Sequence, residues 1–157
     1  MSETKQFAEL EATVDVAASP AEVWALVSDV ERMASWSPQV VRSKVRGGAV
    51  QLGSKFSNLN RHKLVFWPTN GKVVRFDPHR DFAFRIAENR TIWSFQLEQL
   101  PGGGTRVTQR REVPDGISSI SLRGTKVALG GIDKFTDRLR DGMRQTLDRI
   151  KAEAEAS

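Results

Sequence analysis

The sequence predicts an α+β fold in which an antiparallel sheet of about six to seven strands packs against one long C-terminal helix. Three observations favour this class. Short segments in which apolar and polar residues alternate, as in half-buried strands, recur between residues 10 and 113. Turn residues separate most of these segments at intervals too short for crossover helices, so neighbouring strands must run antiparallel. From Ile132 to Ile150, apolar residues return every three or four positions, as on one face of an amphipathic helix.

The first elements are a strand and two short helices. The alternation over Leu10–Val16 predicts a strand with one face in water. The segment Ser19–Glu22 combines a capping box with a proline at the first helical position, so a helix begins there. A second short helix is expected from about Val30 to Trp36, and Pro38 ends it.

Six further strands are expected after Pro38. The clearest turns between them are Asn70–Gly71, Asp77–Pro78 and Pro101–Gly104, since these residues tolerate turn dihedrals. The strands are expected at residues 40–45, 55–59, 72–76, 82–86, 91–97 and 105–113.

Length and composition indicate one globular domain. A chain of 157 residues can bury roughly 70% of its unfolded surface. The hydrophobic share of 39% and the charged share of 27% exclude a membrane protein, a collagen-like fibre and a disordered chain. We expect a single domain over residues 1–157, with a flexible N-terminus at 1–8, a long connection or lid at 115–131, and a fraying end at 152–157.

Charge and cysteine content restrict the partners. The net charge of +5 is too small to predict nucleic-acid binding. No stretch of 18 consecutive apolar residues occurs, so stable membrane insertion is not expected. The absence of cysteine excludes disulfides, thiolate metal sites and cysteine nucleophiles, and it is compatible with the cytoplasm, where we expect the protein. The oligomeric state stays open.

The sequence carries no catalytic signature. His62 and His79 lie in predicted turns without a visible partner, which favours structural or surface roles. We find no metal-ligand spacing, nucleophile elbow, phosphate loop or dinucleotide-binding glycine pattern. We therefore assign no catalytic residue and predict neither a metal nor a cofactor.

Alternation along the strands predicts which side chains face the helix, and most of them are aromatic. Such a set fits either a filled core or a pocket for an apolar ligand. Asn58 and Asn60 belong to it, and they could bind a ligand carbonyl or hydroxyl, or satisfy local backbone groups. The inward residues selected as candidates are Phe56, Asn58, Asn60, Val74, Phe84, Trp93 and Phe95.

The strand expected at residues 105–113 carries the most informative polar side chains. If Val107 faces inward, Gln109 and Arg111 do so too. A buried guanidinium needs a carboxylate, backbone carbonyls or an anionic ligand. Arg111 is therefore either a ligand anchor or a residue that the rim or a bulge turns towards solvent.

The order of elements resembles the helix-grip fold of the START-like superfamily, also called SRPBCC. Four segments, spread from about Leu10 to Glu155, resemble its polyketide cyclase/dehydrase and lipid-transport branch. These segments are Ala18–Arg32 with Trp36–Pro38, Gly53–Phe56 with Asn60–Arg61, Trp93–Glu98 with Gly104–Thr108, and Gly142–Leu147.

The resemblance implies a curved sheet that grips the long helix around an apolar cavity. In this sequence the cavity would receive a small hydrophobic molecule of the lipid or polyketide type. The site would then also include Gln109 and Arg111 from the last strand, and Phe135, Leu139 and Met143 from the helix.

Three functions remain open at this stage. The leading interpretation is non-catalytic binding or carriage of a small hydrophobic ligand, with access gated by residues 117–129 and by the turns after Trp36 and His62. The first alternative is a cyclase, aromatase or dehydratase in which Arg111, Gln109 or an asparagine polarises a carbonyl. The second is a protein-interaction module with a filled core.

Overall fold

The computed structural model describes residues 9–113 and 132–156, with only the backbone described for 132–135. The expectations of a flexible N-terminus at 1–8 and of a connection or lid at 115–131 lie outside these residues. The same holds for the gating role expected of residues 117–129.

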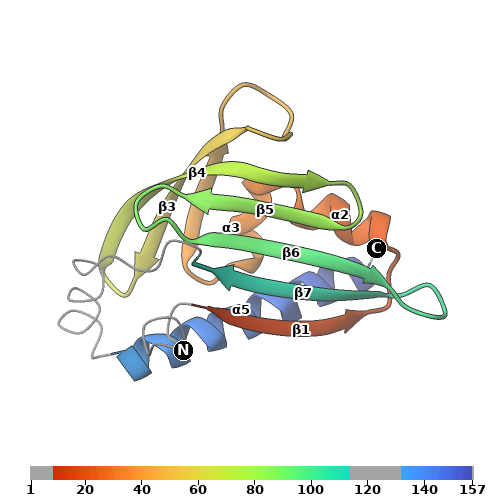
Figure 1. Ribbon diagram of the computed structural model, residues 1–157. Helices are drawn as coiled ribbons and strands as arrows, with labels where there is room; N and C mark the ends of the chain where they lie inside the picture. The colour runs from red at the N-terminus through yellow and green to blue at the C-terminus, as the bar shows by residue number, and fades with distance from the viewer. Residues whose placement is uncertain (1–8, 114–131, 157) are drawn as a thin grey trace.

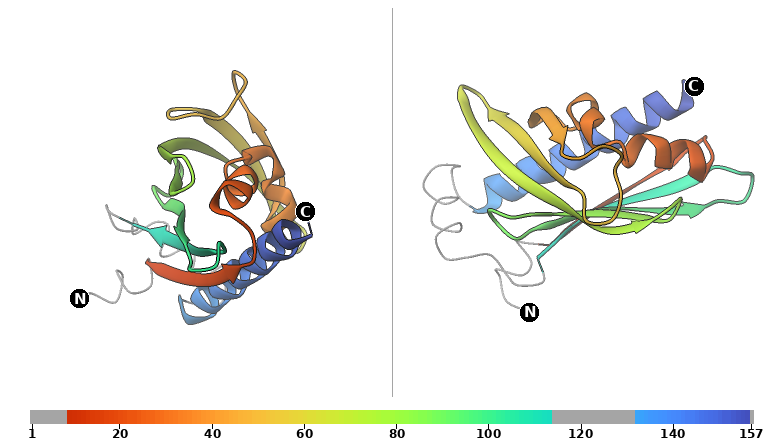
Figure 2. Two further views of the ribbon diagram at one scale, coloured as in Figure 1. Left: turned by 90° about the vertical axis from the view of Figure 1, so that its right-hand side faces the viewer. Right: turned by 90° about the horizontal axis from the view of Figure 1, so that it is seen from above.

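The fold consists of a seven-stranded antiparallel sheet and a long helix, α5 (Ile132–Glu155), which confirms the predicted α+β class. The strand order is β1-β7-β6-β5-β4-β3-β2 (Figure 1). The sheet curls around α5, which lies along its concave side (Figure 2). The strands are β1 (Leu10–Val16), β2 (Val40–Val45), β3 (Lys55–His62), β4 (Val65–Asp77), β5 (Asp81–Ile86), β6 (Ile92–Gln99) and β7 (Thr105–Glu112).

Short helices connect β1 to β2, as predicted. The capping box of α2 (Pro20–Val27) is present: the Glu22 amide donates to Ser19 Oγ, and the Ser19 amide donates to Glu22 Oε1, both at 3.2 Å. The second predicted helix begins as a 3-10 turn, η1 (Val30–Arg32), and continues as α3 (Met33–Trp36). Together with α5 these helices cover the concave face of the sheet (Figure 1).

The C-terminal end of α5 makes contacts with the segment that follows β1. The helix is regular to Glu155, and fraying from residue 152 stays a prediction. Ala154 is buried, and the Glu155 carboxylate accepts a 2.8 Å hydrogen bond from the Ala17 amide. Lys151 adds a 2.9 Å bond to the Asp15 carbonyl. Contacts with the end of β1, distant in sequence, therefore stabilise this last turn.

The predicted turn at Asn70–Gly71 is wrong, because both residues lie inside β4 and the chain turns at Lys63–Leu64 instead. Gly71 pairs with Phe56 across the sheet. A Cβ at Gly71 would lie 2.3 Å from Cζ of the Phe56 ring. The glycine therefore serves close packing against a buried ring and does not form a turn.

The predicted inward position of Val74 is also wrong. A register shift between Val73 and Arg75 places Val74 in a bulge of β4, where it is only half-buried. The fully buried residue is Val73. Since a bulge inserts one residue into the alternation, every position after it changes face relative to a regular strand.

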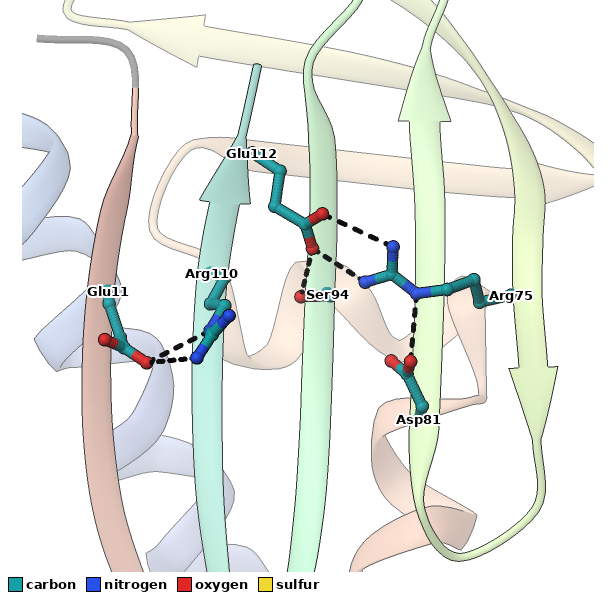
Figure 3. A network of polar contacts seen from close by, with 6 residues as sticks. All are labelled: Glu11, Arg75, Asp81, Ser94, Arg110 and Glu112. Carbon is teal, nitrogen blue, oxygen red and sulfur yellow. Dashed lines mark hydrogen bonds and ion pairs between the residues drawn. The ribbon is translucent and has the colours of Figure 1, made fainter. Parts of the chain in front are cut away.

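A network of charged side chains, which we call the outer clamp, crosses the face of the sheet opposite α5 (Figure 3). Arg75 on β4 donates to Glu112 on β7 at 2.7 and 3.3 Å, and to Asp81 at 2.9 Å. Ser94 donates to the same Glu112 carboxylate at 3.0 Å. Ala83 on β5 and Ser94 on β6 are small outward residues between Arg75 and β7, and both are fully buried. The clamp thus ties four strands together.

We expect Gly71→Ala to lower the free energy of unfolding by about 1–3 kcal/mol, because the new methyl group overlaps the Phe56 ring. Denaturant unfolding measures this loss, and pairing the change with Phe56→Leu should recover part of it. Gly142→Ala is the control, since its Cβ meets only Pro38 Cγ at 3.7 Å. Equal stability of Gly71→Ala and wild type would contradict the packing argument.

We expect Glu112→Gln to cost about 1 kcal/mol at neutral pH, because solvent partly screens the pair with Arg75. The hydrogen bond from Arg75 lowers the pKa of Glu112, so the carboxylate contributes stability above the ordinary value of 4.5 and loses it as the pH falls. The difference between wild type and variant, measured by denaturant unfolding, should shrink below pH 4.5.

Glu11→Gln is the matched control for this experiment. Glu11 pairs with Arg110 on the same face, but both side chains are about half exposed (Figure 3). Its loss should be smaller than that of Glu112→Gln. Equal losses for the two variants would show that the outer clamp stabilises the fold no more than the exposed pair of Glu11 and Arg110 does.

Candidate functional site between the sheet and the C-terminal helix

Part of the interior is filled by aromatic rings in contact with one another. Trp24 of α2 contacts Phe76 and Phe82 edge-on, with centroids 5.2 and 6.0 Å apart. Phe82 continues to Phe84, and Phe84 meets Phe56 edge-on at 5.3 Å. This packing accounts for Phe56, which was predicted to contact a ligand but lies in the core beside the cavity.

Beside these rings lies a cavity of about 620 Å³. Strands β3 to β7 form one side, α5 forms the other, and the segment after α3 closes one end. The predicted site residues that line it are Asn58, Asn60, Phe84, Trp93, Phe95, Gln109, Arg111, Leu139 and Met143. Val74 does not line it, and the side chain of Phe135 lies outside the described residues.

The β7 wall of the cavity carries Gln109 and Arg111, which are only 5% and 4% exposed. Register with both neighbouring strands is unbroken along β7, so no bulge turns these residues to solvent. The Arg111 guanidinium lies 6.0 Å from the centroid of the Trp93 ring. Burial lowers the pKa of Arg111 to about 10, which leaves the side chain charged at neutral pH. Gln109 Oε1 is buried and makes no hydrogen bond within the described part of the chain.

The β3 wall carries two asparagines whose neighbours fix their orientation. Asn58 Oδ1 accepts a 2.6 Å hydrogen bond from Ser43, which leaves its amide nitrogen as a donor. Asn60 donates to the Trp67 carbonyl at 3.2 Å and to Thr69 Oγ1 at 2.9 Å, which leaves its amide oxygen as an acceptor. This wall therefore offers one donor and one acceptor.

The two polar walls are separated by an aromatic strip. In the sheet order, β6, β5 and β4 lie between β7 and β3. Phe84, Trp93 and Phe95 face the cavity from β5 and β6. The site can hold a flat or elongated apolar body on the strip and hydrogen-bond polar groups at either wall. Among the residues that the structure describes, no three His, Asp or Glu side chains gather closely enough to hold a metal ion.

Some lining residues were not selected from the sequence. Trp67 and Thr69 belong to the part of β4 that precedes the misassigned turn, so alternation was not applied there. Gly142 and Thr146 follow Leu139 at helical spacing and lie on the same face of α5. The helical period could have identified these two.

Basic residues surround the cavity where β3 meets the first described turns of α5. Arg61, His62 and Arg138 all line it there. Desolvation and the nearby charges of Arg138 and Lys63 lower the pKa of His62. His62 ends a strand and borders the cavity, although the sequence predicted a turn without a partner.

Comparison with known families agrees with this architecture. The family model described as polyketide cyclase / dehydrase and lipid transport matches residues 8–155. The chain belongs to this family. The match confirms the resemblance found in the sequence, and it extends over nearly the whole chain.

Solved structures of similar fold include a polyketide-cyclase-like protein and two aromatase/cyclases. A polyketide-cyclase-like protein from Corynebacterium glutamicum is 24% identical, with a TM-score of 0.62, over 91% of this chain and 88% of that one. The Zhui aromatase/cyclase of a Streptomyces species is 17% identical, with a TM-score of 0.71, over 94% and 93%. The di-domain aromatase/cyclase StfQ, from the steffimycin biosynthetic pathway, is 14% identical with a TM-score of 0.74, over 98% of this chain and 53% of its own.

At these identities the structural neighbours establish the fold. A search of curated proteins found no match to the chain. No helix within residues 9–113 and 132–156 combines the length and the apolar character needed to cross a bilayer.

We expect Arg111→Met to lower the free energy of unfolding less than Arg75→Met does, because it also removes a charge whose burial opposes folding. The folded-state pKa lies below the unfolded value, so at every pH below about 10 the buried charge reduces stability. Thermal and denaturant unfolding measure the effect. Arg75→Met is the contrasting variant, since it breaks the outer clamp and should destabilise. A loss at Arg111→Met as large as that at Arg75→Met would refute this interpretation.

Proposed function

We propose that the protein binds or carries a small hydrophobic molecule with an acidic or carbonyl group, enclosed between the sheet and α5. The observation that carries the proposal is a 620 Å³ cavity with an aromatic strip and a buried arginine on one wall. This volume falls within the roughly 300–1,000 Å³ typical of small-molecule sites. A module with a filled core would lack such a space.

The apolar part of the ligand is assigned to the strip. Phe84, Trp93 and Phe95 present rings from adjacent strands, and Leu139 and Met143 oppose them from α5. Transfer of an apolar body from water to these side chains supplies the main free energy of binding. Aromatic rings also favour flat or conjugated ligands through offset and edge contacts.

The polar part of the ligand is assigned to the β7 wall. Arg111 remains charged although it is buried, and a carboxylate or polarised carbonyl beside it would offset its lost hydration. The neighbouring Gln109 has a buried acceptor oxygen that a ligand hydroxyl could satisfy. The asparagines on the β3 wall lie across the strip and would orient the far end of the molecule.

A second candidate function is cyclisation or dehydration of a polyketide-like chain. Two of the similar structures are named aromatase/cyclases, and the hydrogen-bonding groups here stand on opposite walls of one cavity. Such walls could bend a flexible chain and polarise its carbonyls, which requires few catalytic groups. Incubation of the protein with a poly-β-ketone mimic, followed by mass spectrometry, distinguishes turnover from binding: loss of one or more waters from the substrate indicates the enzyme.

The first experiment identifies the natural occupant. Native mass spectrometry of the purified protein, followed by solvent extraction, should reveal a hydrophobic molecule of defined mass at up to one copy per chain. Its release on denaturation and the presence of an acidic or carbonyl group would support the proposal. A stoichiometric ligand without either group would contradict the role assigned to Arg111.

The role of Arg111 as the anchor for an acidic group is tested with two dyes that share the same aromatic rings but differ in charge. We expect anilinonaphthalene sulfonate to bind wild type and to bind Arg111→Met at least about tenfold more weakly, because one charge-assisted hydrogen bond is lost. The uncharged N-phenylnaphthylamine should bind both proteins within about twofold. Fluorescence titration gives both affinities.

Arg110→Met is the matched control for the dye experiment. Arg110 is adjacent in sequence, but it points to the outer face and pairs with Glu11 (Figure 3). Its affinity for either dye should equal that of wild type. Equal weakening of both dyes by Arg111→Met would indicate a disturbed cavity and not a lost anchor.

A further inference from the structure

The tip of the β3–β4 hairpin exposes apolar side chains to solvent. We call residues 61–66 the hairpin tip. Leu64, Val65 and Phe66 are 88%, 61% and 52% exposed. Three consecutive large apolar residues in water are unfavourable for an isolated protein, and such patches mark interaction sites.

The tip is ordered by its own cations. Arg61 Nε donates a 2.7 Å hydrogen bond to the Lys63 carbonyl, and its guanidinium lies 5.3 Å from the centroid of the Phe66 ring. Lys63 adopts a left-handed conformation with φ of 55°, which produces the tight turn. Arg61 and Lys63 thus flank the apolar residues with positive charge.

The hairpin tip also lies beside the cavity. The hairpin extends past the rest of the sheet, at the end of the molecule where α5 begins (Figure 2). Arg61 and His62 of the tip, Trp67 just after it and Arg138 of α5 line the cavity. A surface that covered the tip would therefore lie next to this part of the cavity wall.

We propose that the hairpin tip docks on an anionic lipid bilayer. Leu64, Val65 and Phe66 enter the boundary between headgroups and acyl chains, while Arg61 and Lys63 contact lipid phosphates. An apolar tip flanked by cations is the combination that lipid interfaces favour, because burial of apolar area and attraction to anionic headgroups act together. Three apolar side chains give reversible attachment, in which the hairpin tip enters only the interfacial layer of the bilayer.

This inference goes beyond the proposed function and does not depend on it. The docking residues lie outside the aromatic strip, and the anchor Arg111 is buried on another strand. If both hold, a hydrophobic ligand could pass between the bilayer and the cavity with little exposure to water.

Vesicle flotation tests the docking with phosphatidylcholine vesicles that contain or lack phosphatidylglycerol. We expect wild type to float with the anionic vesicles, to bind the neutral ones at least about fivefold more weakly, and to be released by salt. Leu64→Ser combined with Val65→Ser should weaken binding at least about tenfold. Lys63→Gln should weaken it less and reduce its salt dependence.

Two controls separate docking from other effects. Leu52→Ser removes an apolar side chain that is 64% exposed on the β2–β3 connection, and it should float like wild type. Arg111→Met should also float like wild type, whatever its dye affinity. The docking proposal is overturned if wild type fails to float, or if the Leu64/Val65 variant floats equally well. It is also overturned if size-exclusion chromatography shows a dimer that this variant dissociates and neither protein binds vesicles.

Discussion

The two-residue period of β7 is the constraint on which the rest of the molecule depends. The inward members of this strand are all buried: Thr105, Val107, Gln109 and Arg111. Its outward charged members pair with side chains on other strands: Arg106, Arg110 and Glu112. A slip of one residue would bury these three charges and break their ion pairs, so the register is strongly specified. The same period that places Val107 in the core therefore carries Arg111 into the interior.

The polar inward residues line the part of the interior that contains the cavity. Where every inward side chain is aromatic or aliphatic, as around Trp24 and Phe82, the space is filled by rings in contact. Where Asn58 and Asn60 face inward, collapse onto hydrocarbon would bury the Asn58 amide nitrogen and the Asn60 amide oxygen without partners, at a cost of about 1–3 kcal/mol each. The cavity is thus the part of the interior that apolar packing alone cannot close.

Local patterns predicted the elements well, and they failed where a distant contact decides the outcome. The capping box at Ser19 and the alternation of β1 and β7 depend on neighbours in sequence. Asn70–Gly71 has the composition of a turn, yet Gly71 lies inside a strand, where its lack of a side chain leaves room for the Phe56 ring on the neighbouring strand. The bulge at Val74 gives no local signal either, because the pairing of β4 with β5 determines it.

In the candidate site, the inward residues could be predicted from the sequence, but the size of the cavity could not. Alternation alone identified Asn58, Asn60, Gln109 and Arg111 as inward residues, since a regular strand needs no tertiary information. The volume of the cavity could not be predicted, because it depends on how far Leu139 and Met143 of α5 stand from the aromatic strip. Whether an inward aromatic residue packs in the core, like Phe56, or lines the space, like Phe84, depends on the same distance.

Arg111 links the stability of the empty protein to the affinity of an acidic ligand. Folding already removes most of the guanidinium from water, and this burial lowers its pKa to about 10. A carboxylate that enters the cavity must lose its own hydration, but it meets a cation that is already dehydrated and held against Trp93. As the pH rises through about 10, the charge disappears, so the empty protein gains stability while the acidic ligand loses its anchor. The two effects have opposite signs and one origin, which is the dehydration of a single guanidinium group during folding.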